Sequence, residues 1–186
     1  MDIIKINSVE KQNVCLYNVS EVNKMYQLAY RTTELEDWVS RFYMNLGITT
    51  PNSISEERIS RFLGIYVKKK PIPSSFHVIG RYQDIVIDSR EPFEKHREIF
   101  FHELCHILRH SGIQSIMPSS FRELQEWDAH HFTQYAAIPY HMIKFIPFND
   151  RDVIKQMSDM FLVSPELCEE RLKQIIRRNS IKQSLY

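Results

Sequence analysis

The segment Phe100–Leu108 carries two histidines and one glutamate at a spacing that suits metal chemistry. His102 and His106 are four residues apart, so on a helix they lie one turn above each other and both can bind one metal ion. Glu103, between them, can accept a proton from a water molecule that the metal activates. Burying these polar groups among apolar neighbours without a partner would be costly. The sequence therefore predicts a metal site for hydrolysis, with Zn²⁺ as the metal.

A catalytic zinc site needs a third protein ligand and one open position. The extended pattern H-E-x-x-H-x-x-G-x-x-H fails in this chain, because Arg109 and Gly112 occupy its glycine and third histidine positions. The other common solution is a carboxylate from a following helix, and Glu126, twenty residues after His106, is the predicted third ligand. Asp128 is the runner-up. It is rotated about 160–200° around the helix from Glu126, so only one of the two can face the metal.

Length and composition indicate an ordinary globular protein. The chain has 186 residues, of which 43% are hydrophobic and 25% charged, which suits one compact domain. The formal net charge of +1 predicts no strong attraction to nucleic acid. Cys15, Cys105 and Cys168 are widely spaced and odd in number, as expected of reduced thiols. With no secretory leader and no apolar run long enough for a membrane span, we expect a cytoplasmic protein.

Capping signals and apolar periodicity predict a mostly helical chain with one small sheet. Helices are expected at 33–47, 53–64, 92–110, 120–137, 150–161 and 165–178. Strands are expected at 65–67, 76–79 and 84–88, the last two as a hairpin around Gly80-Arg81. Residues at helical spacing that we expect in the core are Trp38, Phe42, Phe62, Phe121, Leu124 and Phe132. The order of helices, a three-stranded sheet and then helices indicates an α+β fold.

The last predicted helix carries a run of basic residues. These are Arg171, Lys173, Arg177, Arg178 and Lys182. Such a run is usually a solvated helix face, and the rest of the chain is not basic enough to suggest a nucleic-acid surface. We therefore expect these side chains to lie at the surface.

Two motifs and their distance give the chain a family resemblance. The pattern H-E-L-G-H, followed by E-x-x-A-N-x-F-A and a proline, is similar to His102–His106, Glu126–Phe132 and Pro139 here. A late V-S helix with an R-L pair corresponds to Val163-Ser164 and Arg171-Leu172. With these features the chain resembles the ImmA/IrrE metallopeptidases of bacteria and their mobile elements.

The resemblance covers about residues 33–178 and has two departures. Cys105 replaces the usual glycine and brings a thiol near the predicted metal site. His130 stands where asparagine or aspartate is usual, one turn after Glu126, at a position that can orient a metal-bound imidazole. Neither departure touches the predicted ligands.

The resemblance implies a fold and an activity. The implied fold is a zincin-like core, with a metallopeptidase domain expected at 33–149 and a C-terminal helical segment at 150–186. Residues 1–32 are expected to be an N-terminal extension that the resemblance does not cover, in which 3–6 and 14–17 have strand-like composition. The activity is that of a zinc-dependent endopeptidase, with Glu103 as catalytic base. The implied substrate is a helix-turn-helix repressor encoded nearby, so the protein would be an anti-repressor that controls a mobile element, a prophage or a stress response.

Other roles and residues remain open at this point. The oxyanion-stabilising group is undecided among Tyr135, His110 and His131, although His110 is most simply a last-turn residue favoured by the helix dipole. An alternative function is a binding module, stapled by its metal, that inactivates a repressor or toxin partner without proteolysis. A closed four-ligand site that includes Cys105 would favour that alternative. A third possibility is the toxin or regulator half of a two-gene pair.

Overall fold

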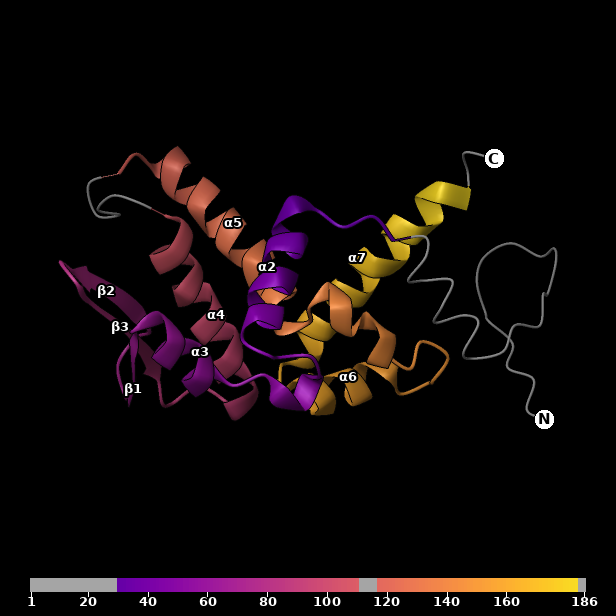
Figure 1. The fold of residues 1–186 in the computed structure, drawn as a ribbon, viewed down its shortest axis with the longest axis horizontal. Coiled ribbons are helices and arrows are strands. Elements are labelled where there is room, and N and C mark those ends of the chain that lie inside the picture. The colour runs from indigo at the N-terminus through magenta and orange to yellow at the C-terminus, as the bar shows by residue number, and fades with distance from the viewer. Residues whose placement is uncertain (1–29, 111–116, 184–186) are drawn as a thin grey trace.

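The computed structural model describes residues 30–110 and 117–183, with side chains up to Arg178 (Figure 1). The predicted strands at 3–6 and 14–17, together with Cys15, Gly112 and the side chain of Lys182, lie outside the described residues. The α+β prediction is confirmed within the described part of the chain, which is mostly helical with one three-stranded sheet.

Helices and strands follow one another in the predicted order. The helices are α2 (Glu34–Asn45), α3 (Glu56–Leu63), α4 (Phe93–Arg109), α5 (Ser119–Ala137), α6 (Val153–Phe161) and α7 (Pro165–Gln183). The strands are β1 (Tyr66–Lys70), β2 (Ser75–Ile79) and β3 (Tyr82–Asp88). Short 3₁₀ turns at Pro51–Ser53 and Tyr140–Phe145 connect helices. Within the described residues, none of the helices combines the length and the apolar character that crossing a membrane requires.

The sheet lies beside α4 at one end of the molecule and has the order β1-β3-β2 (Figure 1). β3 is central, parallel to β1 and antiparallel to β2, and Gly80 at φ 60° forms the tight turn between β2 and β3. β1 is longer than predicted and includes Lys68–Lys70, which the sequence suggested would end it. These lysines stay in the strand because their backbone pairs with β3 and the ammonium group of Lys68 lies 2.6 Å from Asp84.

Two local capping signals determine where the first described helices begin. Thr33 and Glu36 form the predicted capping box of α2, in which each side chain accepts a hydrogen bond from the other's backbone N–H. The start predicted for α3 at Ser53 is wrong, because Ser53 lies in a 3₁₀ turn and Ser55 caps the helix by accepting from the N–H of Arg58. The helix ends as predicted at Gly64, which adopts the left-handed conformation at φ 71°.

The core lies where α4 packs against β3 on one side and α5 on the other. Buried apolar residues of α4 are Phe100, Phe101, Leu104 and Cys105, and those of α5 include Ala129, Phe132 and Ala136. Ala129 is fully buried, and its small side chain lets the two helices approach closely. This close packing brings the side chains of the two motif helices together.

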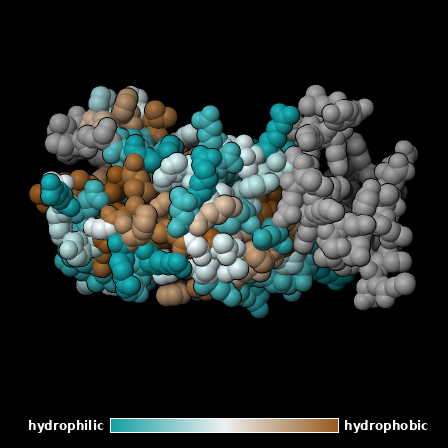
Figure 2. Space-filling view, in the orientation of Figure 1, coloured by the Kyte–Doolittle hydropathy of each residue, from teal (hydrophilic) through white to brown (hydrophobic). Residues whose placement is uncertain are grey.

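Four of the predicted core residues are instead at the surface. Phe62, Phe121 and Leu124 are more than half exposed, and Trp38 is 36% exposed, whereas Phe132 is buried as predicted. In Figure 2 hydrophobic residues gather at the left of the molecule, over the sheet and the α4–α5 pair. Exposed apolar residues of these elements are Val78, Ile79, Phe121, Leu124 and Trp127. Helical spacing identified apolar faces correctly, but it did not show whether another element covers them.

The prediction that the basic residues of the last helix are solvated is wrong for Arg171. Arg171 is fully buried and its guanidinium donates to Glu36 Oε1 at 2.7 Å, to Tyr30 Oη at 3.0 Å and to the carbonyl of Ile138. Arg178 donates to Glu36 Oε2 at 2.5 Å. Only a salt bridge with full hydrogen bonding makes such burial tolerable. This cluster joins α2 to α7, while Lys173 and Arg177 are exposed as predicted.

Candidate metal centre

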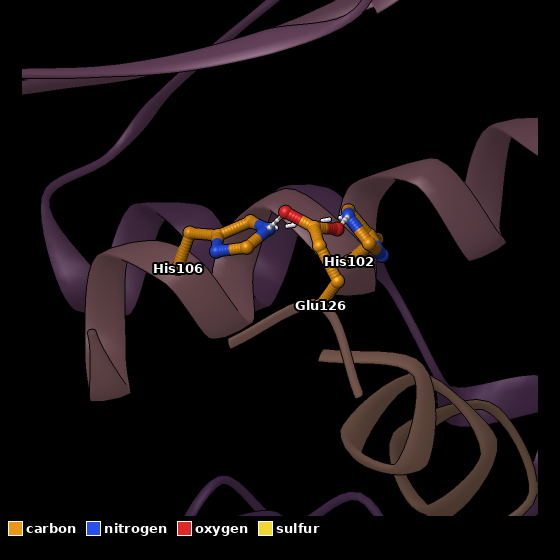
Figure 3. Close-up of side chains that lie close together, drawn as sticks. All are labelled: His102, His106 and Glu126. Carbon is orange, nitrogen blue, oxygen red and sulfur yellow. Dashed lines mark hydrogen bonds and ion pairs between the residues drawn. The ribbon is translucent and has the colours of Figure 1, made fainter. Parts of the chain in front are cut away.

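Three predicted ligands, supplied by two adjacent helices, come together in the structure. His102 and His106 lie one turn apart on α4, and Glu126 reaches them from α5, with its carboxylate between the two rings (Figure 3). Glu126 Oε2 is 3.1 Å from His102 Nε2, and Oε1 is 3.5 Å from His106 Nε2. The two Nε2 atoms are 3.2 Å apart.

These distances suit a tetrahedral metal ion. Zinc bonds of about 2.1 Å to nitrogen and oxygen, at tetrahedral angles, place neighbouring ligand atoms about 3.4 Å apart. The three observed separations, 3.1 to 3.5 Å, lie around this value. Two imidazoles and one carboxylate are also the donor set of a catalytic zinc that keeps a fourth position for water or substrate. The residues therefore fit the metal in both geometry and chemistry.

The centre is closed on one side and open on the other. The His106 side chain is only 3% exposed, and Phe76 of β2 stacks on its ring at a centroid distance of 5.1 Å. His102 and Glu126 are more accessible, with side chains 34% and 51% exposed. The sheet and the helices thus hold His106 firmly, while the side of Glu126 stays open to solvent.

Burial shifts the pKa values of the motif residues in a direction that favours metal binding. Burial lowers the pKa of His106 to about 4, and the neighbouring His102 and His110 add to the shift. Burial also lowers the pKa of His102. Both rings are therefore neutral at pH 7 and carry the lone pairs that a metal needs. Burial and the charge of Glu126 raise the pKa of Glu103 to about 7, a value suited to a proton acceptor near neutral pH.

A second group of polar side chains, made of Arg109, His110 and Asp128, lies next to the candidate metal ligands. Asp128 accepts from Arg109 at 2.8 and 3.2 Å and lies 3.1 Å from His110 Nε2. Burial would raise the pKa of Asp128, but hydrogen bonds and charge from Arg109 and His110 hold it below its usual value. As predicted, Glu126 and Asp128 face different partners.

Cys105 and His130, the two departures from the family pattern, have polar neighbours on α5 and α7. Cys105 Sγ lies 3.8 Å from Asp128 Oδ2, and burial followed by the charge of Asp128 raises the pKa of its thiol. His130 Nε2 contacts Gln134 at 3.0 Å and Glu170 at 3.3 Å.

The candidate oxyanion stabilisers occupy three different places. The Tyr135 hydroxyl accepts from Gln174 at 3.2 Å and from Arg178 at 2.8 Å, so it belongs to the buried cluster between α2 and α7. The ring of His131 packs on Trp127 and hydrogen-bonds the carbonyl of that residue. The ring of His110 lies 2.8 Å from His106, closest to the candidate centre.

Two neighbours of His106 were not predicted as such from the sequence. His110 continues the four-residue spacing of His102 and His106, so the signal was present, but it was assigned to the helix dipole. Phe76 gave no local signal, because its contact depends on how β2 packs against α4. Both are near the site through packing rather than through a motif.

Comparisons with known proteins place the motif helices within a known domain. The family model of the IrrE N-terminal-like domain, Peptidase_M78, matches residues 61–173, more than half of the chain. The protein YqaB of Bacillus subtilis (strain 168) is 32% identical over 81% of this chain and 89% of its own length. The phage-like element PBSX protein XkdA of the same organism is 31% identical over 80% of this chain and 76% of its own length. No solved structure matches the chain.

Proposed function

Because the chain belongs to the Peptidase_M78 family of IrrE N-terminal-like domains, as its sequence predicted, we propose that it is a zinc-dependent endopeptidase. In this proposal His102, His106 and Glu126 hold the metal, and Glu103 is the catalytic base. The observation that carries it is the convergence of two Nε2 atoms and one carboxylate within 3.5 Å of one another. The family is one of metallopeptidases, so the residues and the domain support the same chemistry.

Glu103 performs the proton transfers in this mechanism. When bound, zinc supplies a water nucleophile with a lowered pKa and polarises the scissile carbonyl. The Glu103 carboxylate takes the proton of the attacking water and later delivers it to the leaving amine nitrogen. In the metal-free protein the Glu103 pKa of about 7 reflects burial and the charge of Glu126, and the positive charge of a bound metal would lower it.

An open site favours the enzyme over the binding module. The binding-module alternative is favoured by a fourth protein ligand, for which Cys105 is the candidate. Cys105 Sγ instead lies against Asp128, and its raised pKa keeps the thiol protonated near pH 7. The exposed side of Glu126 leaves room for water or substrate at the fourth position.

The proposed substrate is a helix-turn-helix repressor, which would make the protein an anti-repressor of a mobile element, a prophage or a stress response. This part rests on the family and on one relative, XkdA, which is a protein of a phage-like element. The protein would act in the cytoplasm, where such repressors are found.

The test is cleavage of the repressor encoded beside this chain's gene. Zinc-loaded wild type, Glu103→Gln and the control Glu94→Gln would each be mixed with that repressor and followed on a gel. Glu94 is exposed in the first turn of the same helix, so its substitution should leave cleavage unchanged. Loss of a catalytic base costs about 10²–10⁴-fold in rate, so Glu103→Gln should leave no visible fragments.

Two other results would count against the proposal. Equal cleavage by Glu103→Gln and wild type would refute the role of Glu103. Inactivation of the repressor without fragments, by wild type and Glu103→Gln alike, would establish the binding module in its place.

A further inference from the structure

Three imidazoles follow one another along α4 and its C-terminal end, but only two of them face Glu126. The third, His110, lies between His106 and Asp128. Its Nδ1 is 2.8 Å from His106 Nδ1, and its Nε2 is 3.1 Å from Asp128 Oδ2. Its side chain is only 9% exposed, so neither contact is a chance surface encounter.

The proton count along this chain of groups allows one arrangement that is compatible with metal binding. A neutral imidazole carries one N–H, so His106 can offer its Nε2 lone pair only if its proton is on Nδ1. That N–H must donate to His110 Nδ1, which leaves the His110 proton on Nε2. From there it donates to Asp128, so every donor has an acceptor.

The opposite arrangement is unfavourable at both ends. A proton on His110 Nδ1 would force the His106 proton onto Nε2, where it would block the lone pair that faces Glu126. It would also bring the lone pair of His110 Nε2 against the Asp128 carboxylate, two acceptors 3.1 Å apart. The position of Asp128 therefore selects the tautomer of His106 two groups away.

Arg109 holds Asp128 in this position. Its guanidinium makes two hydrogen bonds to the carboxylate, from Nε to Oδ2 at 2.8 Å and from the terminal nitrogen to Oδ1 at 3.2 Å. A paired guanidinium at the carboxylate also disfavours a second cation there, although Cys105, His110 and Asp128 place three donor atoms within 4.8 Å of one another. The group thus suits hydrogen bonding to His106 better than a metal site of its own.

We propose that His110 and Asp128 are positioning residues that fix the tautomer and ring orientation of His106 through the chain Asp128–His110–His106. Metal-bound histidines usually donate their second N–H to a carboxylate, a carbonyl or water. Here a second imidazole is inserted between the ligand and the carboxylate. This inference rests on the proposed function, because it requires that His106 binds the metal.

The first test is zinc affinity, measured on the full chain by competition with a chromophoric chelator. His110→Phe keeps a ring but removes both nitrogens, and it should weaken zinc binding about 10–100-fold. His110→Asn places an amide oxygen near the former Nδ1 and should recover part of the loss. His96→Phe is the matched control, because His96 is on the same helix and makes its hydrogen bonds and ring contact with Lys69, Glu91 and Phe93; it should bind zinc like wild type.

The second test is the imidazole nitrogen NMR spectrum of the zinc-loaded wild type, which needs no variant to fold. It should show the proton of His106 on Nδ1 and that of His110 on Nε2. The reverse tautomer of His110 would overturn the inference. Melting of the metal-free variants separates a loss of affinity from a loss of folding, because the positioning role requires weaker zinc binding at unchanged metal-free stability.

The outcomes separate this inference from the proposed function. If wild type binds no zinc, the proposed function fails and this inference fails with it. If wild type binds zinc and His110→Phe binds it equally well, only the inference is overturned. Two zinc ions per wild-type chain, one of which is lost in His110→Phe, would overturn it in favour of a second metal site at Cys105, His110 and Asp128.

Discussion

The cluster of charged side chains between α2 and α7 and the cluster between α4 and α5 have opposite electrostatics. In the cluster between α2 and α7, buried Glu36 faces two guanidinium groups, those of Arg171 and Arg178. In the cluster between α4 and α5, the imidazoles of His102 and His106 face the carboxylate of Glu126. The pair His102 and His106 and the carboxylate of Glu126 are its centre.

The pKa shifts reflect this difference. Burial would raise the pKa of Glu36, but the charge of Arg171 and the hydrogen bonds from Tyr30 and Thr33 outweigh it and hold the pKa below its usual value. In the other cluster, burial shifts His106 down to about 4 and Glu103 up to about 7, so each group is driven towards its neutral form. Groups that burial drives towards their neutral forms are typical of functional sites, and neutral imidazoles are the form that binds a cation. In the first cluster two arginines already pair with Glu36. In the second, His102, His106 and Glu126 are suited to hold a metal ion.

The largest expected effect on stability comes from breaking the charged cluster between α2 and α7. Arg171→Met should lower the free energy of unfolding by about 3 kcal/mol, because it removes one partner of a buried charge. The effect should lie at the low end of the usual range, since Arg178 still pairs with Glu36. Denaturant unfolding would measure it. Lys173→Met, on the same helix at an exposed pair with Glu169, should change stability by less than about 0.5 kcal/mol.

A result near zero for Arg171→Met would mean that a methionine of similar length replaces the buried ion pair without loss. The cluster would then contribute specificity of packing rather than stability.

The next largest effect is the stabilisation that zinc binding to His102, His106 and Glu126 should give. Zinc at a hundred times its dissociation constant should raise the free energy of unfolding by about 2.7 kcal/mol, and a chelator should reverse the gain. Glu126→Gln should abolish most of this gain, whereas Glu123→Gln, at an exposed position of the same helix, should retain it. Thermal unfolding with and without zinc would measure both. Equal stabilisation of Glu126→Gln would remove Glu126 from the ligand set.

A smaller effect on the free energy of unfolding should appear in acid, where the Glu36 carboxylate is protonated and loses its negative charge. Because the folded-state pKa of Glu36 lies below its unfolded value, its contribution to stability is present above about pH 4.5 and is lost as the pH falls through the folded pKa. Stability should therefore depend less on pH between about 5 and 3 in Glu36→Gln than in wild type. Glu34→Gln, at an exposed position of the same helix, should keep the wild-type dependence. Denaturant unfolding at several pH values would compare the three proteins.

The two clusters also differ in how far the sequence could predict them. His102, Glu103 and His106 form a pattern within one helix, and Glu126 belongs to a second pattern at a short distance, so local spacing was enough to select them. The partner of Arg171, by contrast, is Glu36, on a helix near the other end of the described chain. No periodicity connects two such residues, and a basic run by itself indicates only a solvated face.

Helix ends were predictable for the same reason that the metal motif was. The capping box of Thr33 and Glu36 and the glycine at 64 act on their own helix, and the structure confirms both. Burial was less predictable, because it depends on which elements pack together. The spacing of Phe62 and Leu124 identified apolar helix faces, but these two side chains remain largely exposed.

The smallest expected effect concerns these exposed apolar residues. Phe62→Ser should change the free energy of unfolding by no more than about 0.5 kcal/mol, because its ring is 63% exposed and makes one edge contact, with Phe42. Phe132→Ser, at a position only 2% exposed that was also predicted to be core, is the buried comparison and should be clearly destabilising, because it leaves a cavity and buries a hydroxyl. Denaturant unfolding of both would compare them. A large cost at Phe62 would mean that another element covers this face in solution, and the difference between predicted and observed burial would then disappear.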